Sequence, residues 1–119
     1  MRREQCISLI LAITWLSSSL LIIGAEPEVL GPDKWPENID VAADMFISRL
    51  PSKDQELIRV TKKNDLVQYH HGWGTSIRNE YGLWRGNQKL IMSACGGNLC
   101  HPDDASMNII ETVWQRLQK

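Results

Sequence analysis

The sequence predicts an all-α fold: a single small domain of about five short helices that follows an N-terminal signal peptide. Two observations lead to this prediction. Apolar residues recur at the three- and four-residue spacing of a helix in several segments, and no long segment alternates apolar and polar residues as a half-buried strand does. Asparagine, aspartate, proline and glycine lie between those segments, where helices begin and end.

Residues 1–25 are typical of a secretory signal peptide. Arg2 and Arg3 give it a positive start, residues 5–25 carry no charge, and Ala25 is small, as the last residue before a cleavage site usually is. An uncleaved anchor is the alternative, because 21 uncharged residues are long enough to span a bilayer. We expect cleavage, which exports the protein to the periplasm or the cell exterior without stable membrane insertion.

The rest of the chain divides into a lead-in over residues 26–37, expected to be extended, and a helical domain over residues 38–119. The leader contains two of the 13 basic and one of the 14 acidic residues, so 11 basic and 13 acidic residues remain, with a formal charge of −2. A nucleic-acid-binding domain would normally show a basic patch or stripe. We therefore expect no nucleic-acid partner.

The lead-in holds three prolines and a glycine, which disfavour regular structure, and Trp35 with Pro36 is expected to anchor it on the domain. A first helix is expected from Asp40, as its N-cap, to about Leu50, and Pro51 ends it. The positions of this helix that are expected to face inward are Val41, Ala42, Met45, Phe46 and Leu50.

A capping-box pattern opens the next segment, because Ser52 is followed three residues later by Gln55. The pattern predicts a second short helix that runs to about Val60. Leu57 and Val60 are expected to face inward.

A third helix is expected to start at Asn64 or Asp65. Its apolar and aromatic stripe consists of Leu66, Tyr69, His70, Trp73 and Ile77. Gly72 and Gly74 each cost about 1 kcal/mol against alanine in a helix, so they indicate a close approach by another element, for which we expect an indole. Gly82 is expected to end this helix in the left-handed conformation.

Two further helices are expected. Asn87 is the predicted N-cap of the fourth, and Pro102 begins the last, which runs to about Leu117 with Asp103 and Asp104 at its positive end. The inward residues of the fourth helix are Leu90, Ile91 and Ala94, and those of the last are Met107, Ile110, Trp114 and Leu117, flanked by Ile109 and Val113.

Several strings in these segments resemble a known family. The strings are Trp35-Pro36, Ile77-Arg78-Asn79-Glu80-Tyr81-Gly82-Leu83-Trp84, Asn87, His101-Pro102-Asp103-Asp104-Ala105-Ser106, and Trp114. Over about residues 35–117 they resemble a small bacterial domain-of-unknown-function family, the one numbered six-seven-nine-four. The resemblance implies no activity, because the family has none assigned, and the family pattern does not include the two cysteines.

Chemically capable residues are densest between residues 69 and 106, and eight of them form a candidate cluster with a structural or a recognition role. The cluster consists of His70, Arg78, Asn79, Trp84, Asn87, His101, Asp103 and Asp104. Arg78 carries a planar guanidinium that matches a carboxylate, so Asp103 and Asp104 are its candidate partners. We favour this buried bridge over the alternative, in which Arg78 faces a ligand. Trp84 is expected to seal the junction between helices, with its indole N–H bonded to one of the two asparagines.

Export favours a disulfide between Cys95 and Cys100, and the glycines between them allow the tight loop that this bond needs. Pairing with another chain is the alternative. Zinc binding by both cysteines and His101, with His70 or His71, is less favoured, since the cysteine spacing falls outside the tightest zinc patterns. A lengthened c-type haem motif from Cys95 to His101, with His70 or a methionine as the second axial ligand, is a further alternative. We expect neither a metal nor a cofactor.

Together these observations favour a small binding or interaction module of the cell envelope, with another envelope protein as its partner, for example as an inhibitor or an immunity protein. The less favoured alternatives are a metal or haem protein and a small hydrolase that uses His70 or His101 with Asp103 or Asp104. Side chains of the cluster that are paired and enclosed would hold the fold. An open cleft with an unpaired histidine would favour an enzyme.

Overall fold

The computed structural model describes residues 30–119, and the predicted signal peptide lies outside them. All regular structure in the described range is helical, which confirms the predicted all-α class. The α-helices are α2 (Ile39–Arg49), α3 (Ser52–Val60), α4 (Trp73–Glu80), α5 (Gln88–Ala94) and α6 (Pro102–Leu117), and the 3-10 helices are η1 (Pro32–Lys34) and η2 (Lys63–Tyr69). Within residues 30–119, no helix is both long and apolar enough to cross a membrane.

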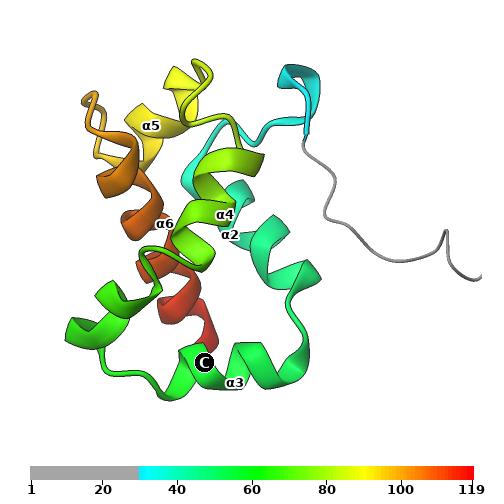
Figure 1. Ribbon diagram of the computed structural model, residues 1–119, viewed down its shortest axis with the longest axis vertical. Coiled ribbons are helices and arrows are strands. Elements are labelled where there is room, and N and C mark those ends of the chain that lie inside the picture. The colour runs from blue at the N-terminus through cyan, green and yellow to red at the C-terminus, as the bar shows by residue number, and fades with distance from the viewer. Residues whose placement is uncertain (1–29) are drawn as a thin grey trace, which may run out of the picture.

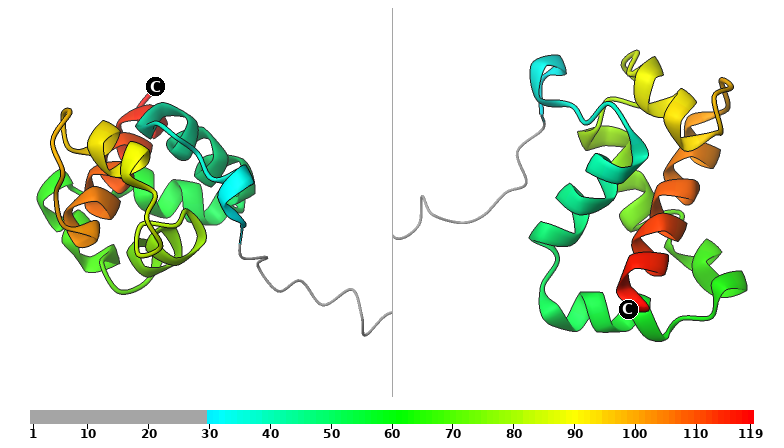
Figure 2. Two further views of the ribbon diagram at one scale, coloured as in Figure 1. Left: turned by 90° about the horizontal axis from the view of Figure 1, so that it is seen from above. Right: turned by 180° about the vertical axis from the view of Figure 1, so that it is seen from behind.

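The central helix is α6, and the other helices surround it (Figure 1, Figure 2). α2 and α4 lie along its sides, α5 lies near its beginning and α3 lies near its end. Because neighbours contact α6 from several directions, its buried face is wide and includes Ile109 and Val113, which have no exposed surface. The predicted stripe is rotated from this face, because Met107, Trp114 and Leu117 are only partly buried.

The start of α2 differs from the prediction. Its N-cap is Asn38, whose Oδ1 accepts the Val41 N–H at 2.9 Å, and Asp40 lies within the first turn. Asp40 instead pairs with Arg116 near the end of α6, with 2.7 Å between Oδ1 and Nη2. In this register Val41 is exposed, whereas Ala43, which the prediction leaves out of the inward face, is buried.

The helix α3 also buries a different residue from those predicted. Ser52 is already helical rather than a capping residue, and the Gln55 amide donates to the last carbonyls of α2. Ile58 faces the core with 1% of its surface exposed, whereas Leu57 and Val60 are 50% and 59% exposed. The prediction that these two residues face inward is therefore wrong, because so short a helix on one end of α6 buries a single apolar position.

The single helix predicted from Asn64 or Asp65 to Gly82 is interrupted. η2 ends at Tyr69, and α4 begins after Gly72, whose backbone angles (φ −88°, ψ −96°) are not helical. The expected close approach occurs at Gly74, where an added Cβ would lie 3.0 Å from Arg78 Nη1. The neighbour of this glycine is therefore a guanidinium and not an indole.

An indole does contact a glycine, but the contact joins Trp35 to Gly82 in the turn after α4. Gly82 has φ +75°, as predicted for the residue that ends this helix, and an added Cβ would overlap the Trp35 ring. Asn87 N-caps α5, as predicted, and its amide donates to the carbonyls of Pro36 at 2.9 Å and Tyr81 at 2.7 Å. These contacts hold the lead-in, which contains η1 rather than being fully extended, against the turn after α4.

Candidate functional site

Arg78 is the centre of the predicted cluster, and only 6% of its surface is exposed. Its Nη1 donates to Ser106 Oγ at 2.8 Å, and its Nη2 donates to the His70 carbonyl and to Thr75 Oγ1, each at 3.0 Å. Its Nε lies 3.4 Å from Asp103 Oδ1. Arg78 therefore links α4 to the start of α6, and the structure forms the bridge to Asp103 that the sequence predicts.

The carboxylate of Asp103 also lies near two histidines, although it has no hydrogen bond to either. His70 Nε2 lies 3.9 Å and His101 Nδ1 lies 3.5 Å from Asp103 Oδ2. His101 Nδ1 also accepts the Asp103 N–H at 3.0 Å, which makes His101 the N-cap of α6. We refer to His70, Arg78, His101, Asp103 and Ser106 as the Arg78 network.

Ser106 is the most enclosed member of the Arg78 network, with no exposed surface. Its hydroxyl donates to the Asp103 carbonyl at 2.9 Å and accepts from Arg78. A catalytic serine has to reach a substrate and to lie beside a base that removes its proton. This hydroxyl is enclosed and bonded to the backbone, so the geometry positions it to hold the start of α6.

Four residues of the predicted cluster do not join the network: Asn79, Asn87, Asp104 and Trp84. Asn87 is buried against the lead-in, where it caps α5. Asn79 and Asp104 are exposed, and Asp103 rather than Asp104 is the acidic partner of Arg78.

The prediction that Trp84 seals the helix junction is wrong, because 54% of its surface is exposed. Trp35 packs on the turn after α4 in its place. The Trp84 ring instead meets the His101 ring edge-on, with the two centroids 5.4 Å apart. Met92 on α5 and Leu99 in the disulfide loop are also exposed. Their elements lie, with the turn after α4, at the end of the domain where α6 begins (Figure 1). We call Trp84, Met92, Leu99 and His101 the loop-end surface.

The sulfur atoms of Cys95 and Cys100 lie at disulfide distance, with 6.3 Å between the two Cα atoms. This intrachain bond engages both sulfurs, so neither is left to bind zinc or to form a haem thioether. In the part of the chain that the structure describes, no three His, Cys, Asp or Glu side chains are grouped so that they could hold a metal ion.

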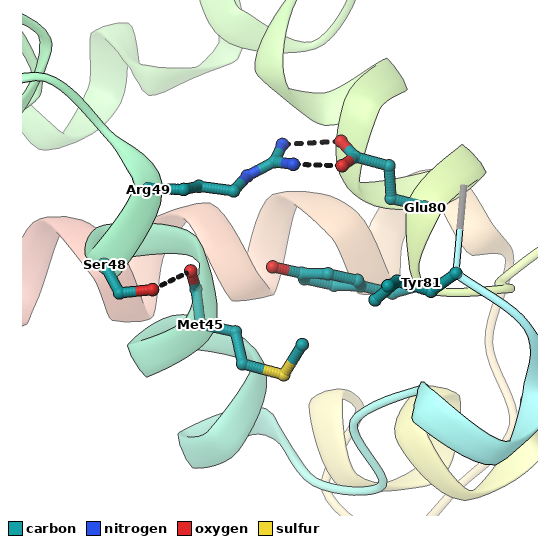
Figure 3. A pocket seen from close by; sticks show the side chains of 6 residues that line it. Met45, Ser48, Arg49, Glu80 and Tyr81 are labelled. Carbon is teal, nitrogen blue, oxygen red and sulfur yellow. Dashed lines mark hydrogen bonds and ion pairs between the residues drawn. The ribbon is translucent and has the colours of Figure 1, made fainter. Parts of the chain in front are cut away.

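A pocket that the sequence does not reveal lies between α2 and the end of α4 (Figure 3). We call it the Tyr81 pocket; its volume is about 210 Å³, and its lining residues are Leu30, Met45, Ser48, Arg49, Glu80 and Tyr81. Arg49 and Glu80 form a bidentate ion pair along one side. Glu80 and Tyr81 belong to the string that carries the family resemblance, but the string does not show that Arg49, 31 residues earlier, meets them.

Tyr81 brings an unsatisfied polar group to this pocket. The residue is 2% exposed, and its hydroxyl points into the space between the Arg49–Glu80 pair and Met45 (Figure 3). Among the buried side-chain nitrogen and oxygen atoms of residues 30–119, this hydroxyl oxygen alone has no hydrogen-bond partner. Burial raises the pKa of Tyr81 to about 12; the charge of Arg49 opposes this rise and that of Glu80 adds to it. The hydroxyl therefore stays protonated at neutral pH, where it can both donate and accept a hydrogen bond.

These features define a small helical domain with a buried arginine network, an intrachain disulfide and a mostly apolar pocket. The profile of the family described as "Domain of unknown function (DUF6794)" matches residues 35–117, and the chain belongs to this family. It is the family that the sequence resembles, and membership assigns no activity. No curated protein and no solved structure matches the chain.

Proposed function

We propose that this protein is an exported binding module that recognises another protein of the cell envelope through its loop-end surface. The exposure of Trp84 is the observation that carries the proposal. Tryptophan is one of the three residue types, with tyrosine and arginine, that are enriched among those that dominate binding energy at protein interfaces. Exposing the indole at the tip of a turn forgoes the burial that such a large apolar side chain otherwise gains.

The hydrogen bonding of the Arg78 network supports a binding role over a catalytic one. Its guanidinium, its serine hydroxyl and the Nδ1 atom of His101 are all engaged in hydrogen bonds that fix the start of α6. The network thereby fixes the position of His101, whose ring meets the Trp84 ring edge-on. In this proposal the Arg78 network therefore has a structural role, which is to support the loop-end surface.

The expected export agrees with the intrachain disulfide, because such bonds persist in oxidising compartments. The disulfide loop carries Leu99 at the loop-end surface, so oxidation would fix the shape of this surface. Cleavage of the leader predicts that protein recovered from the periplasm begins at Glu26. N-terminal sequencing checks this, and a start at Met1 would refute the cleavage.

Capture from a native envelope extract tests the binding role. We expect the tagged protein to retain a specific partner and W84A to lose it by roughly tenfold or more, as substitution of a dominant interface residue does. V67A is the control, because Val67 is also exposed, at 68% against 54% for Trp84, but lies on η2 rather than at the loop-end surface. Recovery of no partner under mild conditions, or equal recovery with both variants, would contradict the proposal.

A further inference from the structure

We propose that the Tyr81 pocket binds a small, uncharged and largely apolar molecule that carries one hydroxyl or carbonyl oxygen. This inference goes beyond the protein-binding role. The pocket shares no residue with the loop-end surface, so the two proposals are tested separately.

The unpartnered hydroxyl of Tyr81 is the first argument for a ligand. Buried polar side-chain atoms are hydrogen-bonded in the large majority of cases, so each exception requires an explanation. The other tyrosine of the described range follows the rule, because the Tyr69 hydroxyl lies 2.6 Å from Thr61 Oγ1. A ligand oxygen in the pocket would give Tyr81 the partner that it lacks.

Each polar side chain beside Tyr81 in the pocket lining has a hydrogen-bond partner within the domain. Arg49 and Glu80 bind each other through both pairs of atoms. The hydroxyl of Ser48 donates to the Met45 carbonyl at 2.7 Å. Among the polar side chains that line the pocket, the Tyr81 hydroxyl is therefore the one that has no hydrogen-bond partner.

The charge and polarity of the lining define the chemical class of the ligand. The charges of Arg49 and Glu80 neutralise each other, and the lining also includes the apolar side chains of Leu30 and Met45. A charged ligand would lose its hydration without gaining an opposite charge, which is unfavourable in such surroundings. An uncharged molecule that buries apolar atoms and pairs one oxygen with Tyr81 meets both requirements.

The volume of the pocket limits the size of the ligand. At about 210 Å³ it exceeds the roughly 150 Å³ of an engineered cavity that binds benzene. It is smaller than the roughly 300–1,000 Å³ of pockets that take drug-sized molecules. A substituted benzene ring or a short alkyl chain with one oxygen fits this range.

Titration of the folded protein with p-cresol and with toluene tests the proposal. The two probes share a methylbenzene skeleton and differ by one hydroxyl, and NMR shifts of backbone amides report where each binds. We expect shifts at Met45, Arg49 and Tyr81, and about fivefold tighter binding of p-cresol, as one net hydrogen bond provides. In Y81F this preference should vanish or reverse, whereas Y69F, which alters a paired hydroxyl outside the pocket, should keep it.

Three results would overturn the inference. One is the absence of shifts at the pocket amides up to the solubility limit of both probes. Another is equal affinity of the wild-type protein for p-cresol and toluene. The third is a p-cresol preference that Y81F retains, because the hydroxyl would then not be the recognition group. Y81F removes a single atom, and its helical circular dichroism checks that it is folded.

Discussion

Replacing Arg78 with leucine removes the buried guanidinium that joins α4 to the start of α6. Leucine cannot donate to the three oxygens that Arg78 bonds, on His70, Thr75 and Ser106. It also leaves the Asp103 carboxylate without its buried cation. We expect R78L to fold but to be markedly less stable.

The magnitude follows from the exposure of each abandoned partner. Ser106 is fully buried and the His70 carbonyl is part-buried, and an unsatisfied buried group costs about 1–3 kcal/mol. The Asp103 side chain is 40% exposed, so water solvates it again and the 3–5 kcal/mol of a fully buried broken pair is an upper bound. We expect a loss of about 3 kcal/mol, which corresponds to a melting temperature lowered by roughly 12–24 °C in a domain of this size.

Urea unfolding followed by the helical signal at 222 nm measures this loss. R59L is the matched control, because Arg59 makes an exposed pair with Glu56 three residues away, and breaking it should cost about 0.5 kcal/mol or less. R78K should lie between wild type and R78L, because lysine keeps the charge but loses the planar fork. Equal unfolding midpoints for R78L and R59L would refute the structural role and would make a ligand-binding role for Arg78 the better reading.

Three further changes test other parts of the structure. Y81F should leave stability unchanged or raise it by up to about 1 kcal/mol at neutral pH, because the deleted hydroxyl has no partner. Between pH 10 and 12 Tyr81 loses its proton in the unfolded state and keeps it in the folded state, so its titration should lower the stability of the wild-type protein by about 3 kcal/mol. Urea titrations at each pH measure this loss, and Y81F should lack it. G82A should cost about 3 kcal/mol by thermal unfolding, because alanine is strained at φ +75° and its Cβ displaces Trp35; an unchanged melting temperature would contradict that packing. I58A should cost about 3 kcal/mol and V60A less than 0.5 kcal/mol, the reverse of what the sequence pattern indicates.

Local signals in the sequence predict the helix boundaries that depend on one residue. Gly82, Asn87 and Pro102 each act within one turn of their own position, and each occupies the predicted place. The inward faces of short helices depend instead on where neighbours lie. The nine residues of α3 contain two plausible apolar faces, and only the position of α6 decides that Ile58 rather than Val60 is buried.

The candidate site shows the same division. The pairing of Arg78 with Asp103 follows from chemistry, because a buried guanidinium needs an acidic partner. Chemistry does not decide which of two tryptophans packs on the turn after α4. In the structure Trp35, rather than Trp84, lies against Gly82. The Tyr81 pocket is harder still to predict from the sequence, because it forms only where α2 brings Arg49 beside the end of α4.

Arg78 and Tyr81 lie three residues apart near the end of α4, and they differ in whether their polar groups are hydrogen-bonded. Arg78 is buried with its donors engaged, so removing it should only weaken the fold. Tyr81 is buried with its hydroxyl unengaged, so removing that hydroxyl should cost the fold nothing. A group that the folded state does not need, and that lies against a pocket, is expected where binding rather than stability requires it. If Y81F is at least as stable as wild type and also loses its preference for p-cresol, the hydroxyl serves binding; if it is less stable, the hydroxyl has a structural partner and this reasoning fails.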